Sequence, residues 1–414
     1  MSFRGRFVRE LGACGSLLLV LVLAPGAFGA SQHERAVCPG PAAAGDARCL
    51  AHVALDAHGT VTTAIAPPAG WYGPGQFHGA YELPASTASA QTIAIVDAYD
   101  DPTVRSDLTE YDRAYAISNL ESCKSSSEGG CFLKVNQRGE AKNYPKANSG
   151  WALEIALDVE TAHEICQNCK VVLVEASSSS TTNLDAAEET AVRLGASEIS
   201  NSWGTESEYS GEVSENIHFN HPGIAITVAS GDKGYAHFGY PAASPDVIDA
   251  GGTTLKLTAT ANAYGPYSWA GESTWSGSGS GCSLYFKAQE WQANALNWTL
   301  TGCSASRGVA DVAADANPET GAAVYDTTRY YGSSGWFHVG GTSLASPLIA
   351  GVYALAGNAA GVEYPGSIPY GHAGSLHDVT EGAATGGCST TACAAGTGYD
   401  GPSGLGTPAG LGGF

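Results

Sequence analysis

Residues 340–355 read Gly-Gly-Thr-Ser-Leu-Ala-Ser-Pro-Leu-Ile-Ala-Gly-Val-Tyr-Ala-Leu. A Gly-Gly-Thr-Ser turn that runs into an apolar stretch predicts a helix with Ser343 at its N-terminus. At such an end the backbone N–H groups are unpaired and the helix dipole is positive, and both favour an oxyanion that develops beside the hydroxyl. A serine that only caps the helix would give the same pattern. This stretch alone therefore leaves a nucleophilic and a structural role open for Ser343.

The chain upstream of this stretch alternates short apolar strands with helical segments. Strands are predicted at 92–97, 170–176, 198–203 and 224–230, and helices after Pro102 and at 151–166, 183–194 and 211–220. This alternation predicts an α/β fold with a parallel sheet flanked by helices on both faces, in which sites form at the carboxyl ends of strands. Residues 255–300 and the Gly-rich tail from 382 are predicted to be irregular.

The first thirty residues have the pattern of a secretory signal peptide. Three arginines precede the apolar run 17–23, and small residues at 27–30 suit cleavage. The apolar run is too short to span a bilayer well. We expect a secreted, extracellular protein. Residues 31–70 then form a short propeptide or N-terminal extension, and 71–414 form the main domain.

The charge balance is strongly acidic. Forty Asp and Glu against nineteen Lys and Arg give a formal net charge of −21. It becomes about −23 once the predicted signal segment is removed. This charge argues against binding to nucleic acid or to an anionic membrane surface, since both need a positive face. A pI near 4.7 suits a protein that works in acid, and simple solubility would explain the charge equally well.

Ten cysteines remain after the signal segment, and they fall as sequence neighbours. An even number in an exported chain predicts disulfides, for which local pairing is our hypothesis. The pairs would be Cys38/Cys49, Cys123/Cys131, Cys166/Cys169, Cys282/Cys303 and Cys388/Cys393. Cys166-Gln-Asn-Cys169 is also a CxxC motif, so a redox or zinc role is an alternative to a structural bridge.

The predicted helix at 151–166 carries two acidic pairs. Glu154 and Asp158 are four residues apart, so they lie on one helix face, and their neighbours are apolar. A like-charged pair is costly in such a setting, which favours a functional role. Glu160 and Glu164 have the same spacing, and we interpret them as solvated acids.

A third carboxyl group follows the predicted strand 224–230. Asp232 in Ser-Gly-Asp-Lys-Gly would lie at the carboxyl end of that strand, although an ordinary turn aspartate would fit as well. A histidine base in a His-Gly-Thr motif occurs only as His58-Gly59-Thr60. That motif precedes the strand that ends at Asp97 and lies in the predicted extension, so we interpret it as a coincidence.

Taken together, these motifs resemble the sedolisins, the serine-carboxyl peptidases with a subtilisin-like fold, over roughly residues 72–414. The resemblance is carried by Glu154-Ile-Ala-Leu-Asp158, Ser200-Asn-Ser-Trp203-Gly204, Ser230-Gly-Asp232-Lys-Gly234, Tyr240-Pro-Ala-Ala-Ser-Pro245, Gly251-Gly-Thr-Thr-Leu255, Ala310-Asp-Val-Ala-Ala-Asp-Ala-Asn-Pro318 and Gly341-Thr-Ser343.

The resemblance implies a role for each matching residue. Ser343 would be the nucleophile and Glu154 its general base. Asp158 would support Glu154 in the proton relay, and Asp232 would donate a hydrogen bond to the oxyanion. Asp97 and Trp203 match outer positions of the same network.

Acidic conditions would suit this set of residues. At about pH 3–4 an ordinary histidine is protonated and cannot act as a base, whereas a carboxylate titrates in that range. An aspartate can donate a hydrogen bond only when it is protonated. The implied substrates are polypeptides, and we expect a monomer.

The tail resembles the calcium loop of the same family. The implied ligands of one structural Ca²⁺ are Asp378, Asp400 and the carbonyl groups of Val379, Gly396 and Gly398. Carboxylate and carbonyl oxygens are the hard ligands that calcium prefers. Many sedolisins carry a large N-terminal activation domain, whereas here about forty residues separate the predicted signal from the main domain.

Several functional alternatives stay open at this stage. An exported binding protein could keep the fold without catalysis. A tripeptidyl-peptidase would use the same site, a neutral subtilisin would need a histidine, and a thiol oxidoreductase would use Cys166 and Cys169.

Overall fold

The largest sheet is built from the apolar strands that the sequence predicts and from several that it does not. In the computed structural model, which describes residues 1–2, 33–124 and 129–414, this sheet has eight strands. They are β5 (Thr92–Ala98), β6 (Phe132–Asn136), β7 (Lys170–Ala176), β8 (Glu198–Asn201), β10 (Ala225–Ala229), β11 (Ile248–Thr258), β12 (Ser268–Thr274) and β15 (Val312–Asp315). The predicted signal segment lies outside the described residues, apart from its first two.

The strands run in the order β12-β11-β10-β8-β5-β7-β6, and β15 pairs with β11. All neighbours are parallel except β11 and β12, which are antiparallel. Every residue of β7 and β10 is buried, as expected for parallel strands that are covered by other elements. The predicted α/β architecture with a mainly parallel sheet is therefore confirmed.

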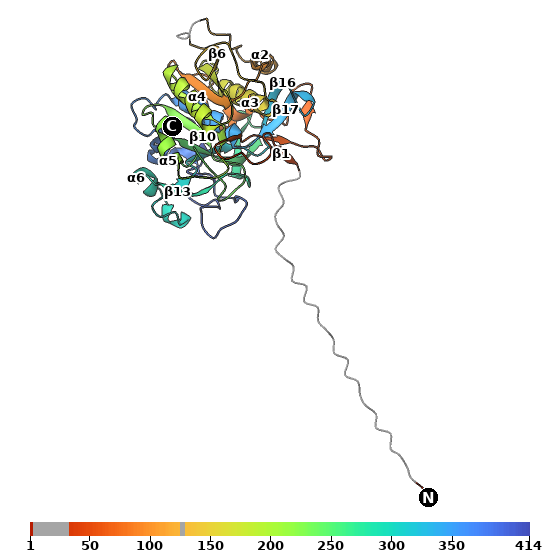
Figure 1. Ribbon diagram of the computed structural model, residues 1–414, viewed down its shortest axis with the longest axis vertical. Coiled ribbons are helices and arrows are strands. Elements are labelled where there is room, and N and C mark those ends of the chain that lie inside the picture. Colours follow the sequence, from red (N-terminus) through yellow and green to blue (C-terminus); the bar gives the residue numbers. More distant parts are fainter. Residues whose placement is uncertain (3–32, 125–128) are drawn as a thin grey trace. The chain divides into compact units, whose positions relative to one another are not determined.

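Helices flank this sheet (Figure 1). The described helices of the chain are α1 (Pro74–Tyr81), α2 (Val104–Tyr115), α3 (Ser149–Ile165), α4 (Thr181–Arg193), α5 (Glu212–Glu215), α6 (Glu290–Ala293), α7 (Thr342–Ala356) and α8 (Ile368–Gly371). Short 3-10 turns are η1 (Asn216–His218), η2 (Trp298–Thr301), η3 (Pro365–Ser367) and η4 (Ala373–Ser375). Helix α4 packs on β5 and β7, whereas α3 and α7 pack on each other and on central strands.

Local sequence explains where α3 starts. The side chain of Asn148 accepts hydrogen bonds from the N–H groups of Gly150 and Trp151, which caps the helix. The helix is buried from Gly150 to its end, because α2 and β16 (Ala322–Tyr330) cover the side that faces away from the sheet and α7.

Residues 34–64 contribute strands that the sequence did not reveal. Strands β1 (Glu34–Ala36), β3 (His52–Ala54) and β4 (Thr63–Ala64) join β16 and β17 (Ser333–Gly340) in a second sheet. Strand β2 (Arg48–Cys49) pairs with β9 (Trp203–Gly204). Strands of two or three residues are too short to show an alternating pattern, which is why this region looked irregular.

Other local differences from the predictions are small. The predicted strand at 198–203 is interrupted at Ser202 into β8 and β9, and the predicted helix at 211–220 is α5 followed by η1. The segment predicted to be irregular contains β12, β13 (Gly281–Lys287) and α6. The remaining strands form two antiparallel pairs, of β13 with β14 (Ser306–Val309) and of β18 (Leu376–His377) with β19 (Thr407–Pro408).

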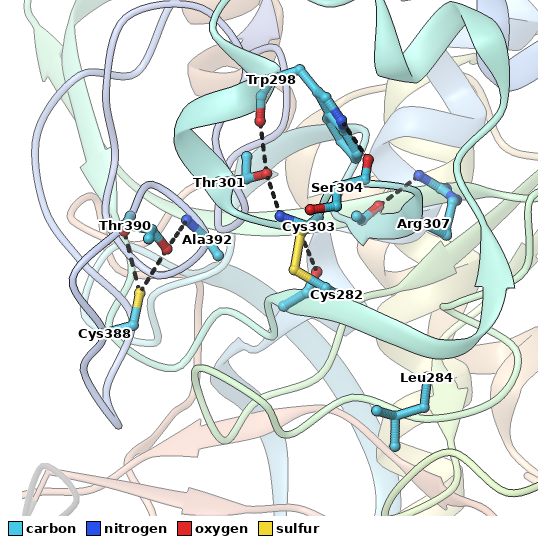
Figure 2. Close-up of a disulfide and its surroundings, with 12 residues drawn as sticks. Cys282, Leu284, Trp298, Thr301, Cys303, Ser304, Arg307, Cys388, Thr390 and Ala392 are labelled. Carbon is cyan, nitrogen blue, oxygen red and sulfur yellow. Dashed lines mark hydrogen bonds between the residues drawn. A yellow bond between two sulfur atoms is a disulfide. The ribbon is translucent and has the colours of Figure 1, made fainter.

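All five predicted disulfides are present, which confirms local pairing. Cys166 and Cys169 form a buried bridge just after α3, as the structural interpretation requires. Figure 2 shows the Cys282–Cys303 bridge, where the Thr301 hydroxyl accepts from Cys303 N at 3.1 Å and donates to Trp298 O at 2.8 Å. Among the described helices, none combines the length and apolar character needed to cross a membrane.

Candidate active site

Ser343 lies in the first turn of α7 and is fully buried. The cap position is Gly341, whose positive φ of 95° is a conformation that favours glycine, so the capping alternative for Ser343 is wrong. The Ser343 hydroxyl donates to the carbonyl oxygen of Ser202 at 3.3 Å. The nucleophile candidate is thus held between the N-terminus of α7 and the segment that joins β8 to β9.

Glu154 and Asp158 lie on α3, and neither side chain is exposed. Asp158 Oδ1 accepts from the Ser202 hydroxyl at 2.9 Å, and Glu154 Oε2 accepts from the N–H of Ala51 at 3.0 Å. Burial raises the pKa of both carboxyl groups well above their ordinary values, and the charge of Asp97 acts in the same direction. The hydroxyl of Ser343 interacts with Glu154 and opposes the increase in its pKa.

Asp97 lies near the carboxyl end of β5 and belongs to the same cluster. Burial raises its pKa to about 8. Neither of its oxygens has a hydrogen-bond partner among the described residues. Trp203 lies next to it, since its ring N–H donates to the carbonyl of Val96 at 3.0 Å. Both residues therefore lie beside the acidic cluster, and the outer roles that the resemblance implies for them stay predictions.

Asp232 approaches Ser343 from the loop that follows β10. Its Oδ1 accepts from the backbone N–H of Thr342 at 2.9 Å and from the Thr342 hydroxyl at 2.8 Å. Its Oδ2 has no hydrogen-bond partner among the described residues and lies 3.6 Å from His52 Nε2. Burial raises the pKa of Asp232, and the charge of His52 opposes this increase.

The structure therefore brings Ser343, Glu154, Asp158 and Asp232 together, although they come from three separate parts of the chain. The site combines a hydroxyl, carboxyl groups that can accept its proton and a carboxyl group that can donate one. Such a combination suits acyl transfer.

Two supporting residues were missed by the sequence reasoning. Ser202 bonds Asp158 through its hydroxyl and Ser343 through its carbonyl, and Thr342 fixes the orientation of Asp232. Both lie within the motifs that carry the resemblance to the sedolisins. Their contacts depend on tertiary packing and have no signal in the sequence.

One expectation about α3 is wrong. Glu160 and Glu164 are 2% and 0% exposed, not solvated. Glu160 accepts from the N–H of Tyr325, and Glu164 accepts from the Tyr111 hydroxyl. The reason is that the second sheet and α2 cover the outer face of α3, which a helix pattern alone cannot reveal.

His58 is exposed in a tight turn, where Asp56 N donates to Thr60 O at 2.8 Å. Its own N–H donates to the side chain of Asp56. This placement agrees with the interpretation of the His-Gly-Thr motif as a coincidence.

The C-terminal loop brings the two predicted calcium carboxylates near each other. Asp400 Oδ2 accepts from Gly396 N at 3.0 Å, and Asp378 Oδ2 accepts from Gly398 N at 3.1 Å. Burial raises the pKa of Asp400 to about 8, and the charge of Asp378 adds to this. The hydrogen bonds among the described residues leave the carbonyl oxygens of Val379, Gly396 and Gly398 without a donor. This set of oxygens fits a hard cation.

A second acidic cluster was not predicted. The carboxylates of Asp101, Asp107 and Asp326 are buried, and oxygens of the three lie within 4.8 Å of one another. Burial raises the pKa of Asp101 to about 6 and that of Asp326 to about 9. Three hard oxygen ligands at this spacing could hold a cation, and protonation in acid would relieve the same repulsion.

Comparisons with known proteins agree with this geometry. The profile of the subtilase family matches residues 143–364, more than half of the chain. Sedolisin from Pseudomonas sp. (strain 101) is 31% identical over 214 residues, which are 45% of this chain and 33% of that protein. Kumamolisin from Bacillus sp. (strain MN-32) is 29% identical over 361 residues, 80% of this chain and 61% of that protein. The chain thus spans between a third and about three-fifths of these curated relatives.

Among solved structures, a Pseudomonas sedolisin, a serine-carboxyl proteinase in complex with two molecules of pseudo-iodotyrostatin, is also similar. It aligns with a TM-score of 0.67 and 25% identity, over 83% of this chain and 96% of that one. Sphericase aligns with a TM-score of 0.50 at 18% identity, which bears on the fold alone. The chain therefore belongs to the subtilase family, and within it is a distant homologue of the sedolisins.

Proposed function

We propose that this protein is a secreted endopeptidase that hydrolyses polypeptides in acid through an acyl-enzyme on Ser343. The observation that carries the proposal is the shared burial of Ser343 with Glu154 and Asp158 on one side and Asp232 on the other. The hydroxyl lies between a carboxyl group with which it interacts, Glu154, and a carboxyl group whose Oδ2 has no partner among the described residues, Asp232.

In the first step, Glu154 accepts the proton of the Ser343 hydroxyl as the oxygen attacks the substrate carbonyl carbon. Asp158, which is hydrogen-bonded to Ser202, supports the charge state of Glu154 in the relay. Glu154 then returns the proton to the leaving nitrogen. Water then attacks the ester through the same proton transfers and regenerates the Ser343 hydroxyl.

Asp232 stabilises the negative oxygen of the tetrahedral intermediate. Its Oδ1 is saturated by Thr342, so a proton on Asp232 resides on Oδ2, the oxygen that has no partner among the described residues. Because burial raises the pKa of Asp232, the carboxyl group keeps this proton at higher pH than an ordinary aspartate does. Loss of one such donor typically costs about 10²–10³ in rate.

A structural calcium ion would be held by Asp378, Asp400 and the carbonyl groups of Val379, Gly396 and Gly398. When bound, it would neutralise two carboxylates and fix the C-terminal loop. Asp400→Asn should then lower the melting temperature of calcium-loaded protein and make it insensitive to a chelator. An unchanged melting curve and unchanged chelator sensitivity would contradict this assignment.

The decisive experiment is a pH–rate profile on casein beside Ser343→Ala and Asp232→Ala. The wild type should show its maximum in acid, and Ser343→Ala should be inactive. Asp232→Ala, which removes the side-chain donor, should lose roughly 10²–10³ in kcat. Mass spectrometry of the products distinguishes internal cleavage from tripeptide release. A catalytically silent binding protein of this fold would leave casein intact, and a maximum near neutral pH that depends on a histidine would contradict the carboxyl mechanism.

A further inference from the structure

The segment around Leu50 lies against the candidate active site in the manner of a bound peptide. Arg48 pairs with Gly204 and Cys49 with Trp203 in an antiparallel register. The N–H of Leu50 continues the ladder by donating to Ser202 O at 3.1 Å. A short antiparallel strand on an open edge is a common way for proteins to hold an extended peptide.

One peptide bond of this segment lies among the reactive groups. The carbonyl oxygen of Ser202 accepts from both Leu50 N–H and the Ser343 hydroxyl, so the serine lies beside Leu50. The next nitrogen, that of Ala51, donates to Glu154 Oε2 at 3.0 Å.

The carbonyl oxygen of the same bond lies near Asp232. A Cβ atom added at Gly341 would lie 2.2 Å from Leu50 O and 3.0 Å from Asp232 Oδ2, so the two oxygens flank one point. The bond Leu50–Ala51 therefore has the nucleophile beside it, the base at its nitrogen and the oxyanion donor near its oxygen.

The side chains of the segment are also accommodated. Leu50, 7% exposed, lines a pocket together with Gly204, Ala229 and Gly231. Its Cδ1 lies 3.6 Å from where a Cβ of residue 204 would be, so glycine there leaves room for the leucine. Arg48, 8% exposed, has its guanidinium 3.5 Å from a carboxylate oxygen of Glu206.

Both flanks of the segment are anchored. On one side, the Cys38–Cys49 disulfide closes a loop. On the other, β3 pairs with β17 through Val53 and Val339, and with β1. These contacts hold the segment in the cleft, where it excludes any other peptide.

We infer that Leu50–Ala51 is a self-cleavage site and that residues 48–51 block the cleft until this bond is cut. The inference rests on the proposed function. It also names a preference, because the pocket that holds Leu50 would accept a leucine-like residue immediately before the cleaved bond of other substrates.

The reaction balances with the groups already described. Ser343 Oγ bonds to the Leu50 carbonyl carbon while its proton passes to Glu154. The bond from that carbon to the Ala51 nitrogen breaks, and the nitrogen takes the proton from Glu154. Water then splits the ester, which restores the Ser343 hydroxyl and leaves a carboxyl group on Leu50. The released fragment ends at Leu50 and keeps its disulfide, since Cys38 and Cys49 both precede the cut.

The test uses the full chain, isolated at about neutral pH and shifted to about pH 4, where the carboxyl mechanism operates. Intact mass, N-terminal sequencing and casein hydrolysis are followed in parallel. We expect a new N-terminus at Ala51 in the wild type, appearing together with casein hydrolysis, and no such N-terminus in Ser343→Ala.

A matched pair of variants tests the pocket. Leu50→Glu should slow self-cleavage at least about ten-fold, because a carboxylate replaces an apolar side chain in the pocket. Leu284→Glu, at an exposed leucine 81% accessible to solvent and far from β2 in the sequence, should cut at the wild-type rate. The wild-type time course carries the test even if Leu50→Glu does not fold.

The outcomes separate the two proposals. Casein hydrolysis by a chain that stays intact across residues 48–52, or self-cleavage at another bond, would overturn the inference and leave the peptidase function standing. Absence of both self-cleavage and casein hydrolysis across the acid range would overturn the proposed function, and the inference with it.

Discussion

Helix α3 carries two acidic pairs with the same i,i+4 spacing, and their surroundings differ. Glu154 and Asp158 contact Ala51 and Ser202 beside the nucleophile candidate. Glu164 instead accepts a hydrogen bond from the Tyr111 hydroxyl at 2.7 Å, and Glu160 accepts one from a backbone N–H of β16 at 3.0 Å. Burial raises the pKa of all four carboxyl groups.

The comparison shows that burial and a raised pKa do not by themselves identify a catalytic carboxyl group. What differs is the neighbour. Glu154 interacts with the Ser343 hydroxyl, whereas Glu164 accepts a hydrogen bond from the Tyr111 hydroxyl and Glu160 accepts one from a backbone N–H. A function is expected only where a reactive group is within reach.

The largest expected difference is in activity. Glu154→Gln should reduce kcat by at least about 10³-fold, because the amide cannot accept the serine proton. Glu164→Gln, the same change on the same helix, should keep kcat within a few-fold. Steady-state assays on one peptide substrate in acid measure both. Equal losses in the two variants would show that both pairs act only through the fold.

A smaller loss of activity is expected at Asp158, the second acid of the pair beside Ser343. Asp158→Asn should reduce kcat by roughly 10²-fold and leave KM nearly unchanged, since Asp158 supports Glu154 and does not touch the substrate. Glu160→Gln is the matched control. An effect confined to KM would place Asp158 in substrate binding instead.

The second pair on α3, Glu160 and Glu164, should affect the free energy of unfolding and not the activity. Burial raises the pKa of Glu164 to about 8 in the folded protein, above its unfolded value near 4.5. The folded state therefore binds the proton more tightly. The associated stability is present in full below about pH 4.5 and is lost as pH rises toward 8, by up to about 1.4 kcal/mol per pH unit. Glu164→Gln should flatten this part of the curve, as measured by denaturant unfolding at several pH values.

A stability that increases with pH would contradict this prediction for Glu164. If the free energy of unfolding of the wild type rises between acid and neutral pH, and Glu164→Gln does not change its slope, the glutamate is not held in its neutral form.

The smallest effect is expected from the outer member of the cluster. The charge of Asp97 raises the pKa of Glu154 and of Asp158, so Asp97→Asn should move the acid limb of the pH–rate profile to lower pH. The shift should be less than about one unit, because burial keeps Asp97 itself largely protonated in acid. A shift to higher pH would mean that Asp97 does not act through its charge.

Much of the fold could be predicted from local pattern. Strand β7 matches its predicted bounds, and α3 and α4 match theirs to within two residues, because long apolar runs and a helical period are local signals. Strands β1 to β4 could not be predicted, because each has only two or three residues and is stabilised by pairing with β3, β9 or β17. The solvated character expected for Glu160 and Glu164 failed for a related reason, since the cover of α3 comes from β16.

The candidate site divides in the same way. The residue types at 343, 154, 158 and 232 were evident in the sequence because each motif is contiguous. The contacts of Ser202, Thr342 and Leu50 were not, because each joins segments that are distant in the chain.

By itself, the sequence determined the α/β architecture, the local disulfides and the candidates for the acidic and nucleophilic groups, because these depend on spacing along the chain. Only the tertiary structure decided which carboxyl group has a reactive neighbour and which is a buried structural acid. It also decided that the segment at Leu50 lies along β9. The physical reason is that long-range strand pairing and burial set the surroundings of each side chain, and those surroundings set its pKa and its partners.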